Sequence, residues 1–221
     1  MESTTKLKDL EAARSLVYQR LADAYRQPSL PLGATLDALA DALACLDSEA
    51  REEADRLRKS YAALADKCIL EIEYTRLFLG PFVVPAPPYG SIYLEKSRRL
   101  MGDSTIDAKR HYLSVGLDLS PEFKDAPDHI AAELEFMQAL IVQGIAAVEA
   151  SDGQLLLENI RQQHTFLNQH LGAWIPLFTA KVSESASCDY YRHLAALTRI
   201  FIDEDMAALP NPADLQASSA V

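Results

Sequence analysis

A long apolar stripe in the second half of the chain is the strongest constraint on the fold. From Asp128 onward, apolar side chains recur at steps of 4, 3, 4, 4 and 3 residues, at Ile130, Leu134, Met137, Ile141, Ile145 and Val148. This spacing places them on one face of an α-helix. Phe136 and Leu140 widen the face, so the sequence predicts a central helix that is buried on most of its sides.

The rest of the chain also carries helical rather than strand patterns. Glycine is scarce, with 8 residues, and no alternating apolar pattern extends beyond four residues. Such a composition favours helices over a turn-rich β architecture. We therefore expect an all-α fold, a single globular bundle of about nine or ten helices over residues 1–209, with a frayed tail at 210–221. The expected helices cover about 6–26, 34–45, 48–66, 67–79, 102–115, 128–151, 154–171, 174–182 and 188–209.

One segment interrupts the helical pattern, with the sequence GPFVVPAPPYGSIY from Gly80 to Tyr93. Four of its residues within a stretch of eight are proline, which excludes a regular helix and a central strand. The segment is nevertheless apolar and aromatic. A stiff, apolar loop must either pack on the core or form a binding surface.

The overall charge excludes some partners and favours others. The formal net charge is −11, from 21 Lys and Arg against 32 Asp and Glu. An acidic surface repels nucleic acid and anionic lipid, and it attracts cationic partners. We therefore expect neither nucleic-acid binding nor stable membrane insertion.

The cysteines and the N-terminus predict a cytoplasmic location. Cys45, Cys68 and Cys188 are scattered, as expected for reduced thiols rather than for a disulfide framework or a zinc site. The first residues, MESTTKLKDLEAARSL, contain no apolar signal region, and no stretch is expected to approach the roughly 20 apolar residues that span a bilayer.

A polar group occurs at the start of the predicted central helix, in DAPDHIAAELEFM. His129 and Glu133 are four residues apart, so they share a helix face. The pair could act as metal ligands or as an acid and a base, and together with Asp128 it could instead bind a cationic ligand. The third interpretation is structural: Asp128 caps the helix, and His129 and Glu133 pair along it.

Catalysis and bound cofactors are not expected. The chain has no HExxH, GxSxG, Walker-type or dinucleotide-binding motif. Its other histidines are far apart in the sequence, which suggests surface or helix-end positions, at His111, His164, His170 and His193. The sequence therefore predicts a protein that is not an enzyme, with no metal site.

Two motifs carry a resemblance to a known family. The run EYTRLFLGPFVVPAPPYGSIYLEKSRRLMGDST, followed by PDHIAAELEFM, closely resembles the TorD/DmsD family of redox-enzyme maturation chaperones. The resemblance is strong from Glu73 to Met137 and extends more loosely to Trp174 and the final helix. It implies an all-α fold, a cytoplasmic location and no resident cofactor, with weak GTP binding in some members. It also implies a monomer or a domain-swapped dimer.

The resemblance further implies a partner and a site. Such proteins bind the twin-arginine leader of a molybdopterin-dependent oxidoreductase of the DMSO or TMAO reductase type, hold the apoenzyme during cofactor insertion and prevent premature export. The corresponding leader-binding positions in this chain are Leu77, Phe78, Pro88, Tyr89, Tyr93, Gly102, Asp128, His129 and Tyr25, to which our own analysis adds Glu133.

The predicted mechanism has an apolar part and a charged part. The leader's apolar region would lie on Phe78, Pro88, Tyr89 and Tyr93, and its arginines would face Asp128. Tyr89 and Tyr93 replace tryptophans of the DMSO reductase chaperones, which leaves the client enzyme open. Two alternatives remain, a metal-dependent hydrolase that uses His129 and Glu133, and a stable assembly subunit of a respiratory complex.

Overall fold

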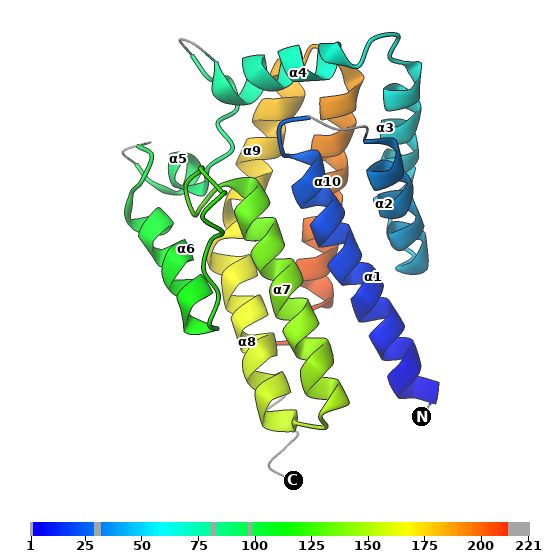
Figure 1. Cartoon of the computed structure of the whole chain (residues 1–221), viewed down its shortest axis with the longest axis vertical. Helices are drawn as coiled ribbons and strands as arrows, with labels where there is room; N and C mark the ends of the chain where they lie inside the picture. The colour runs from blue at the N-terminus through cyan, green and yellow to red at the C-terminus, as the bar shows by residue number, and fades with distance from the viewer. Residues whose placement is uncertain (1, 29–31, 81–82, 97–98, 212–221) are drawn as a thin grey trace.

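The computed structural model describes residues 2–28, 32–80, 83–96 and 99–211, and all regular secondary structure in these ranges is helical (Figure 1). It confirms the all-α prediction and the expected number of helices. The described residues form ten α-helices and one π-helical turn, η1: α1 (Glu2–Ala24), α2 (Gly33–Cys45), α3 (Arg51–Ala63), α4 (Cys68–Tyr74), η1 (Thr75–Leu79), α5 (Gly90–Leu94), α6 (Asp103–Ser114), α7 (Ile130–Glu149), α8 (Gly153–Gln169), α9 (Leu171–Ser185) and α10 (Asp189–Ala208).

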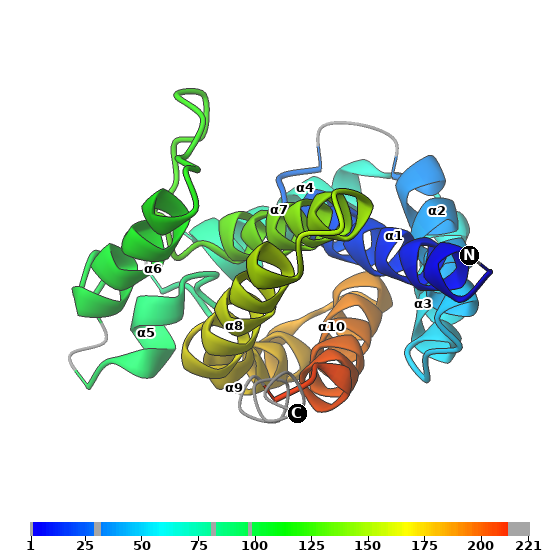
Figure 2. The ribbon, with the colours of Figure 1, turned by 90° about the horizontal axis from the view of Figure 1, so that it is seen from below.

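Helix α7 is the central helix that the apolar stripe predicts. It packs against α1 on one side and α8 on the other, while α9 and α10 close the bundle behind it (Figures 1 and 2). Leu134, Met137 and Leu140 are completely buried. Helices α2 and α3 cover α1 and α10 at one side of the molecule, and α5 and α6 lie at the opposite side.

The burial of α7 also explains its hydropathy. The sequence suggested no stretch of membrane-spanning length, but α7 has 20 residues and a mean hydropathy of 1.4 over its most apolar window. Of that window, 61% is buried inside the protein. Its apolar composition is therefore accounted for by its place in the core of the bundle.

The proline-rich segment contains a helix that the sequence analysis missed. Tyr89 is extended, and the five-residue helix α5 then begins at Gly90. Before the segment, η1 ends at Gly80, whose φ of +33° lies in the left-handed region that favours glycine. Residues 81 and 82 lie outside the described part.

Some helix ends differ from the predicted ones. Helix α9 begins at Leu171 and includes Pro176, so it is longer than expected. Helix α3 begins at Arg51 rather than near residue 48, and the Ser48 hydroxyl accepts a hydrogen bond from the N–H of Ala50, which directly precedes the helix. Of the predicted C-terminal tail, only residues 210 and 211 are described, so the division at 209 stays a prediction.

A buried charge network joins the first helix to the last. Arg14 on α1 donates to both carboxylate oxygens of Asp205 on α10, at 2.5 and 2.9 Å, and the Tyr18 hydroxyl donates to the same carboxylate at 2.6 Å. All three side chains are buried. Removal of the carboxylate would leave a buried guanidinium without its partner, which is strongly unfavourable.

We predict that Asp205→Ala lowers the free energy of unfolding by roughly 3–5 kcal/mol. Asp203→Ala on the same helix is the matched control, because Asp203 pairs with Arg199 on the surface. The control should cost less than about 1 kcal/mol. Urea unfolding followed by circular dichroism measures both, and equal losses in the two variants would contradict the importance of the buried network.

Candidate functional site

Backbone hydrogen bonds attach the proline-rich segment to the start of α7. The N–H of Ile130 donates to the carbonyl of Pro88, and the N–H of Gly90 donates to the carbonyl of Asp128, each at 2.9 Å. These bonds form an isolated antiparallel bridge between Tyr89 and His129. The bridge brings together the two motifs that the sequence analysis singled out, although about forty residues separate them in the chain.

Tyr89 is the aromatic side chain of this junction that remains partly accessible. Its ring is half-buried and lies 5.3 Å from the ring of His129, in an edge-on arrangement. Its hydroxyl donates to the carboxylate of Asp125 at 2.7 Å. Asp125 is exposed, so an aromatic ring and an accessible negative charge lie side by side.

Tyr93 lies one turn further along, on α5. Its ring is half-buried and stacks on Trp174 of α9, with 5.6 Å between ring centroids and 15° between planes. The indole N–H of Trp174 donates to Glu133 at 2.8 Å. A β-carbon at Gly90 would lie 3.1 Å from that indole nitrogen, so the glycine permits α5 to approach α9 closely.

One hollow borders the proline-rich segment, and another lies at its junction with the start of α7. One, of about 390 Å³, is largely apolar and is lined by Val84, Pro85, Pro87, Ile92, Tyr93, Leu177, Ala180, Lys181 and Glu184. The other, of about 370 Å³, has a mixed lining, with the acids Glu122 and Asp125, the cations Arg26 and Lys124, and apolar side chains. Val83 and Leu177 near the apolar hollow are 80% and 53% exposed. The segment therefore borders an apolar hollow, and through the Tyr89 hydroxyl it also contacts the exposed carboxylate of Asp125.

Several predicted site residues lie inside the protein. Phe78 is 2% exposed and contacts the rings of Tyr25, Tyr74, Phe178 and Tyr191. Leu77 and Tyr25 are buried as well. These three residues support the segment from below, and in this structure none of them presents a surface to a ligand.

Asp128 is also buried, and its structural role differs from the predicted one. The sequence left open whether it binds a cationic ligand or caps its own helix, and in the structure the nitrogen Nδ1 of His129 accepts the hydrogen bond from the N–H of Ala131 and caps α7. The carboxylate of Asp128 accepts from the N–H of Ser91 in α5, at 2.7 Å. Asp128 therefore holds the start of α5, and Asp125 is the nearby acid that faces solvent.

Gly102 is part of another helix start. It directly precedes α6, and the carboxylate of Glu95 lies so close that a β-carbon would come within 2.0 Å of it. That carboxylate accepts from the N–H of Ser104 at 2.9 Å and from its hydroxyl at 2.6 Å. Gly102 thus permits Glu95 to cap α6.

Burial shifts the pKa values of His129 and Glu133 in opposite directions. Burial lowers the pKa of His129 to about 4, although Asp125 and Asp128 oppose this effect. Burial likewise raises the pKa of Glu133 well above its usual value, opposed by the hydrogen bond from Trp174. His129 uses one ring nitrogen as a helix cap and Glu133 is bonded to Trp174, so the two residues do not converge on a metal site.

A different cluster was missed by the sequence analysis. Asp107 and His111 on α6 approach His170, which lies between α8 and α9. Their nearest ligand atoms all lie within 4.8 Å of one another. The spacing of four between Asp107 and His111 was a usable signal, but no local pattern indicates that His170 would join them.

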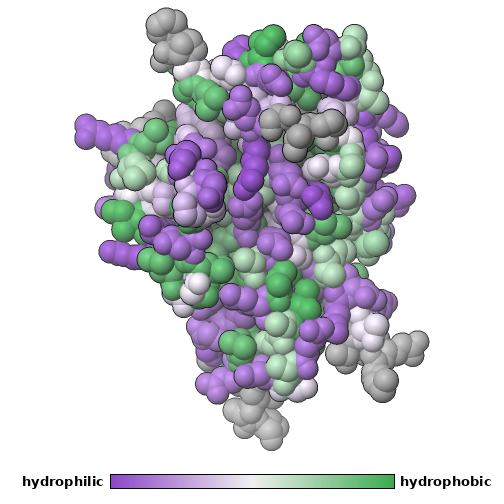
Figure 3. Space-filling view, in the orientation of Figure 1, coloured by the Kyte–Doolittle hydropathy of each residue, from purple (hydrophilic) through white to green (hydrophobic). Residues whose placement is uncertain are grey.

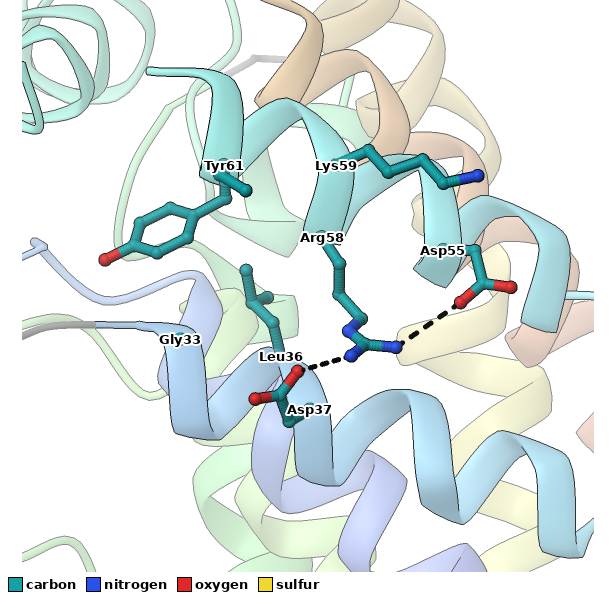
Figure 4. Close-up of a pocket in the computed structure, with 8 residues that line it drawn as sticks. Gly33, Leu36, Asp37, Asp55, Arg58, Lys59 and Tyr61 are labelled. Atoms are coloured by element: carbon teal, nitrogen blue, oxygen red, sulfur yellow. Dashed lines mark ion pairs between the residues drawn. The ribbon is translucent and has the colours of Figure 1, made fainter. Parts of the chain in front are cut away.

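A further hollow of about 480 Å³ lies between α2 and α3, far from these residues (Figure 4). Arg58 at its edge pairs with Asp37 at 2.8 Å and with Asp55 at 3.5 Å. Its charged groups are therefore largely satisfied by one another.

The face in Figure 3 is mainly hydrophilic, with small separate hydrophobic patches, including some on the side where α5 and α6 lie.

Comparisons with known proteins give consistent matches. The sequence model of the family described as "Nitrate reductase delta subunit" matches residues 26–180. The chain is 30% identical to the chaperone protein TorD of Psychrobacter sp. over 66% of its length, and 28% identical to the Tat proofreading chaperone DmsD of Salmonella typhi over 63%. It spans 65% and 61% of those relatives, less than two thirds of their length.

Two more matches extend over most of the chain. The chaperone protein TorD of Shewanella pealeana is 27% identical over 91% of this chain and 92% of its own length. A crystal structure described as that of a redox enzyme maturation protein from Archaeoglobus fulgidus superposes with a TM-score of 0.54. It covers 86% of this chain and 93% of its own, at 21% identity, so it supports the fold alone.

We predict that His129 makes stability fall in mild acid. The unfolded side chain binds a proton near pH 6.5 and the folded one only near pH 4, so stability is full above pH 6.5 and is lost as the pH falls toward 4. The loss amounts to about 3 kcal/mol. His129→Asn retains a capping acceptor but does not titrate, so its urea unfolding should depend less on pH over this range. Parallel pH curves for the variant and the wild type would contradict the prediction, and His164→Asn on α8 is the control.

Proposed function

Because the chain belongs to the TorD/DmsD family of redox-enzyme maturation chaperones, we propose that it binds the twin-arginine leader of a molybdopterin-dependent oxidoreductase. The client would be an enzyme of the DMSO or TMAO reductase type. The protein would act in the cytoplasm, hold the apoenzyme during cofactor insertion and delay its export. The curated relatives are named chaperones, and the chain is accordingly a chaperone and not an enzyme.

The observation that carries the proposal is the proline-rich segment, which borders an apolar hollow and contacts an exposed carboxylate. A twin-arginine leader is basic at one end and apolar in its middle. Its apolar region would lie in the hollow between Pro85, Tyr93 and Leu177, and its arginines would approach Asp125. The prolines fix the shape of this surface in advance, which lowers the entropy cost of binding.

The buried members of the predicted site take a supporting role in this proposal. Asp128 and His129 hold the segment against α7, and Phe78 and Tyr25 pack beneath it. We therefore assign direct leader contact to Tyr89 and Tyr93, and we replace Asp128 by Asp125 as the acid that faces the arginines. The net charge of −11 would assist the encounter with a cationic leader.

A second candidate is a stable subunit of a respiratory complex. The description of the matching family model names a subunit of nitrate reductase, which favours this alternative. Copurification from anaerobically grown cells separates the two roles. A chaperone should be recovered with the precursor that still carries its leader, and a subunit with the mature, cofactor-loaded enzyme.

We predict that Tyr89→Ala weakens the binding of a synthetic twin-arginine leader by about 1–3 kcal/mol, the usual range for a central aromatic contact. Isothermal titration calorimetry measures the affinity. Tyr61→Ala is the matched control, because Tyr61 is also partly buried but lines the hollow between α2 and α3. Equal affinities for wild type and Tyr89→Ala would refute the assignment.

We predict that Asp125→Asn lowers leader affinity and flattens its dependence on salt, because an exposed ion pair is screened by added ions. Asp128→Asn should leave the salt dependence unchanged and lower the stability of the protein, because Asp128 is buried and bonded to Ser91. Titrations at several sodium chloride concentrations distinguish the two acids. A flattened salt dependence in Asp128→Asn alone would restore Asp128 as the acid that binds the arginines.

A further inference from the structure

We propose that Asp107, His111 and His170 form a binding site for a divalent transition metal of the zinc class. The oxygen Oδ2 of Asp107 lies 3.0 Å from Nε2 of His170 and 3.8 Å from Nε2 of His111. Two imidazole nitrogens and one carboxylate oxygen are a ligand set that suits zinc and its neighbours in the first transition row. Among the described residues, this is the group of three side chains that can converge on one ion.

The surroundings of the cluster hold the two imidazole rings in place. The His170 ring stacks on Phe166, with centroids 4.9 Å apart and 13° between planes, and the His111 ring meets Phe166 edge-on at 5.5 Å. The side chain of His170 is only 3% exposed, whereas that of Asp107 is 46% exposed. The buried histidine is therefore fixed, and the carboxylate provides an open side from which an ion can enter.

A pair of unsatisfied buried atoms lies behind the cluster. Nδ1 of His170 and Oε1 of Glu133 are both buried without a hydrogen-bond partner, and they lie 3.8 Å apart. Since a carboxylate can only accept, Nε2 of His170 carries the hydrogen that is donated to Asp107, and Nδ1 then carries none. At 3.8 Å the two atoms are too far apart for a hydrogen bond with each other.

Metal binding would exchange the roles of the two ring nitrogens. A metal ion takes the lone pair of Nε2, so the hydrogen of the neutral ring moves to Nδ1 and points at Glu133. Histidine ligands commonly donate their second N–H to a carboxyl group in this way, which orients the ring. Glu133 in turn is held by the indole N–H of Trp174 at 2.8 Å. The ion would thus complete a chain of contacts that the protein already contains.

The consequence for the fold is a cross-link of α6. Its main helical neighbour is the short helix α5, and both lie at the side of the bundle (Figure 2). Asp107 and His111 belong to α6, whereas His170 belongs to the corner between α8 and α9. A bound ion would fasten this peripheral helix to the bundle and raise the stability of the folded protein through mass action.

Calorimetric titration of the full chain, without an affinity tag and after treatment with EDTA, tests the site with Zn²⁺. We expect saturable binding of one ion per chain and a rise in melting temperature. His111→Ala and Asp107→Ala should each weaken Zn²⁺ binding at least about tenfold. Loss of a residue that only orients a metal ligand already weakens binding by about 10–100-fold, and these two residues are ligands themselves. His164→Ala on the neighbouring surface of α8 is the matched control and should bind like the wild type.

Two further measurements exclude other sources of binding. Nitrogen-15 spectra of His170 should show the hydrogen on Nε2 without metal and on Nδ1 with Zn²⁺. Absence of saturable binding, or unchanged affinity in both His111→Ala and Asp107→Ala, would overturn the proposal. So would binding that disappears only when the exposed Cys45 and Cys68 are replaced by serine, since the thiols would then be the ligands.

Discussion

The attachment of one backbone segment to another determines the shape of the candidate site. Proline has no N–H, so the segment that contains Pro85, Pro87 and Pro88 can make few backbone hydrogen bonds of its own. It is held by the bonds between Pro88 and Ile130 and between Gly90 and Asp128, and by the carboxylate of Asp128 on Ser91. The positions of Tyr89 and Tyr93 follow from these few contacts. The start of α7 therefore belongs to the core of the bundle and also holds the proline-rich segment in place.

The helical core could be predicted well from the sequence because its signal is local. The stripe from Ile130 to Val148 needs no partner to be recognised as one helical face, and the burial of Leu134 and Met137 follows from it. Helix ends were less accurate. Pro176 was expected near the start of a short helix, but in the structure it lies inside the longer α9, since the Trp174 and Phe178 side chains of that helix are buried in the core.

The site was harder to predict because its geometry depends on contacts between distant parts of the chain. The sequence placed Asp128 at a helix start, but nothing local shows that its carboxylate turns toward α5 and leaves the cap to His129. The burial of the predicted site residues could not be recognised from the sequence either. An aromatic residue such as Phe78 can lie at a surface or in a core with the same neighbours in sequence. The approach of His170 to Asp107, from the far end of α8, belongs to the same class of long-range information.

The π-helical turn at Thr75–Leu79 makes the protein sensitive to the number of residues between α4 and the proline-rich segment. A turn of this kind corresponds to one residue more than a continuous α-helix would hold. Loss of a single residue would allow unbroken α-helix, but it would rotate α4 relative to Leu77 and Phe78 by about 100°, the angle per residue of an α-helix. Tyr74 could then no longer share the aromatic cluster with Phe78. Neighbouring side chains can repack around a substitution in this turn. A one-residue deletion would instead rotate the side chains of α4 away from those of Leu77 and Phe78.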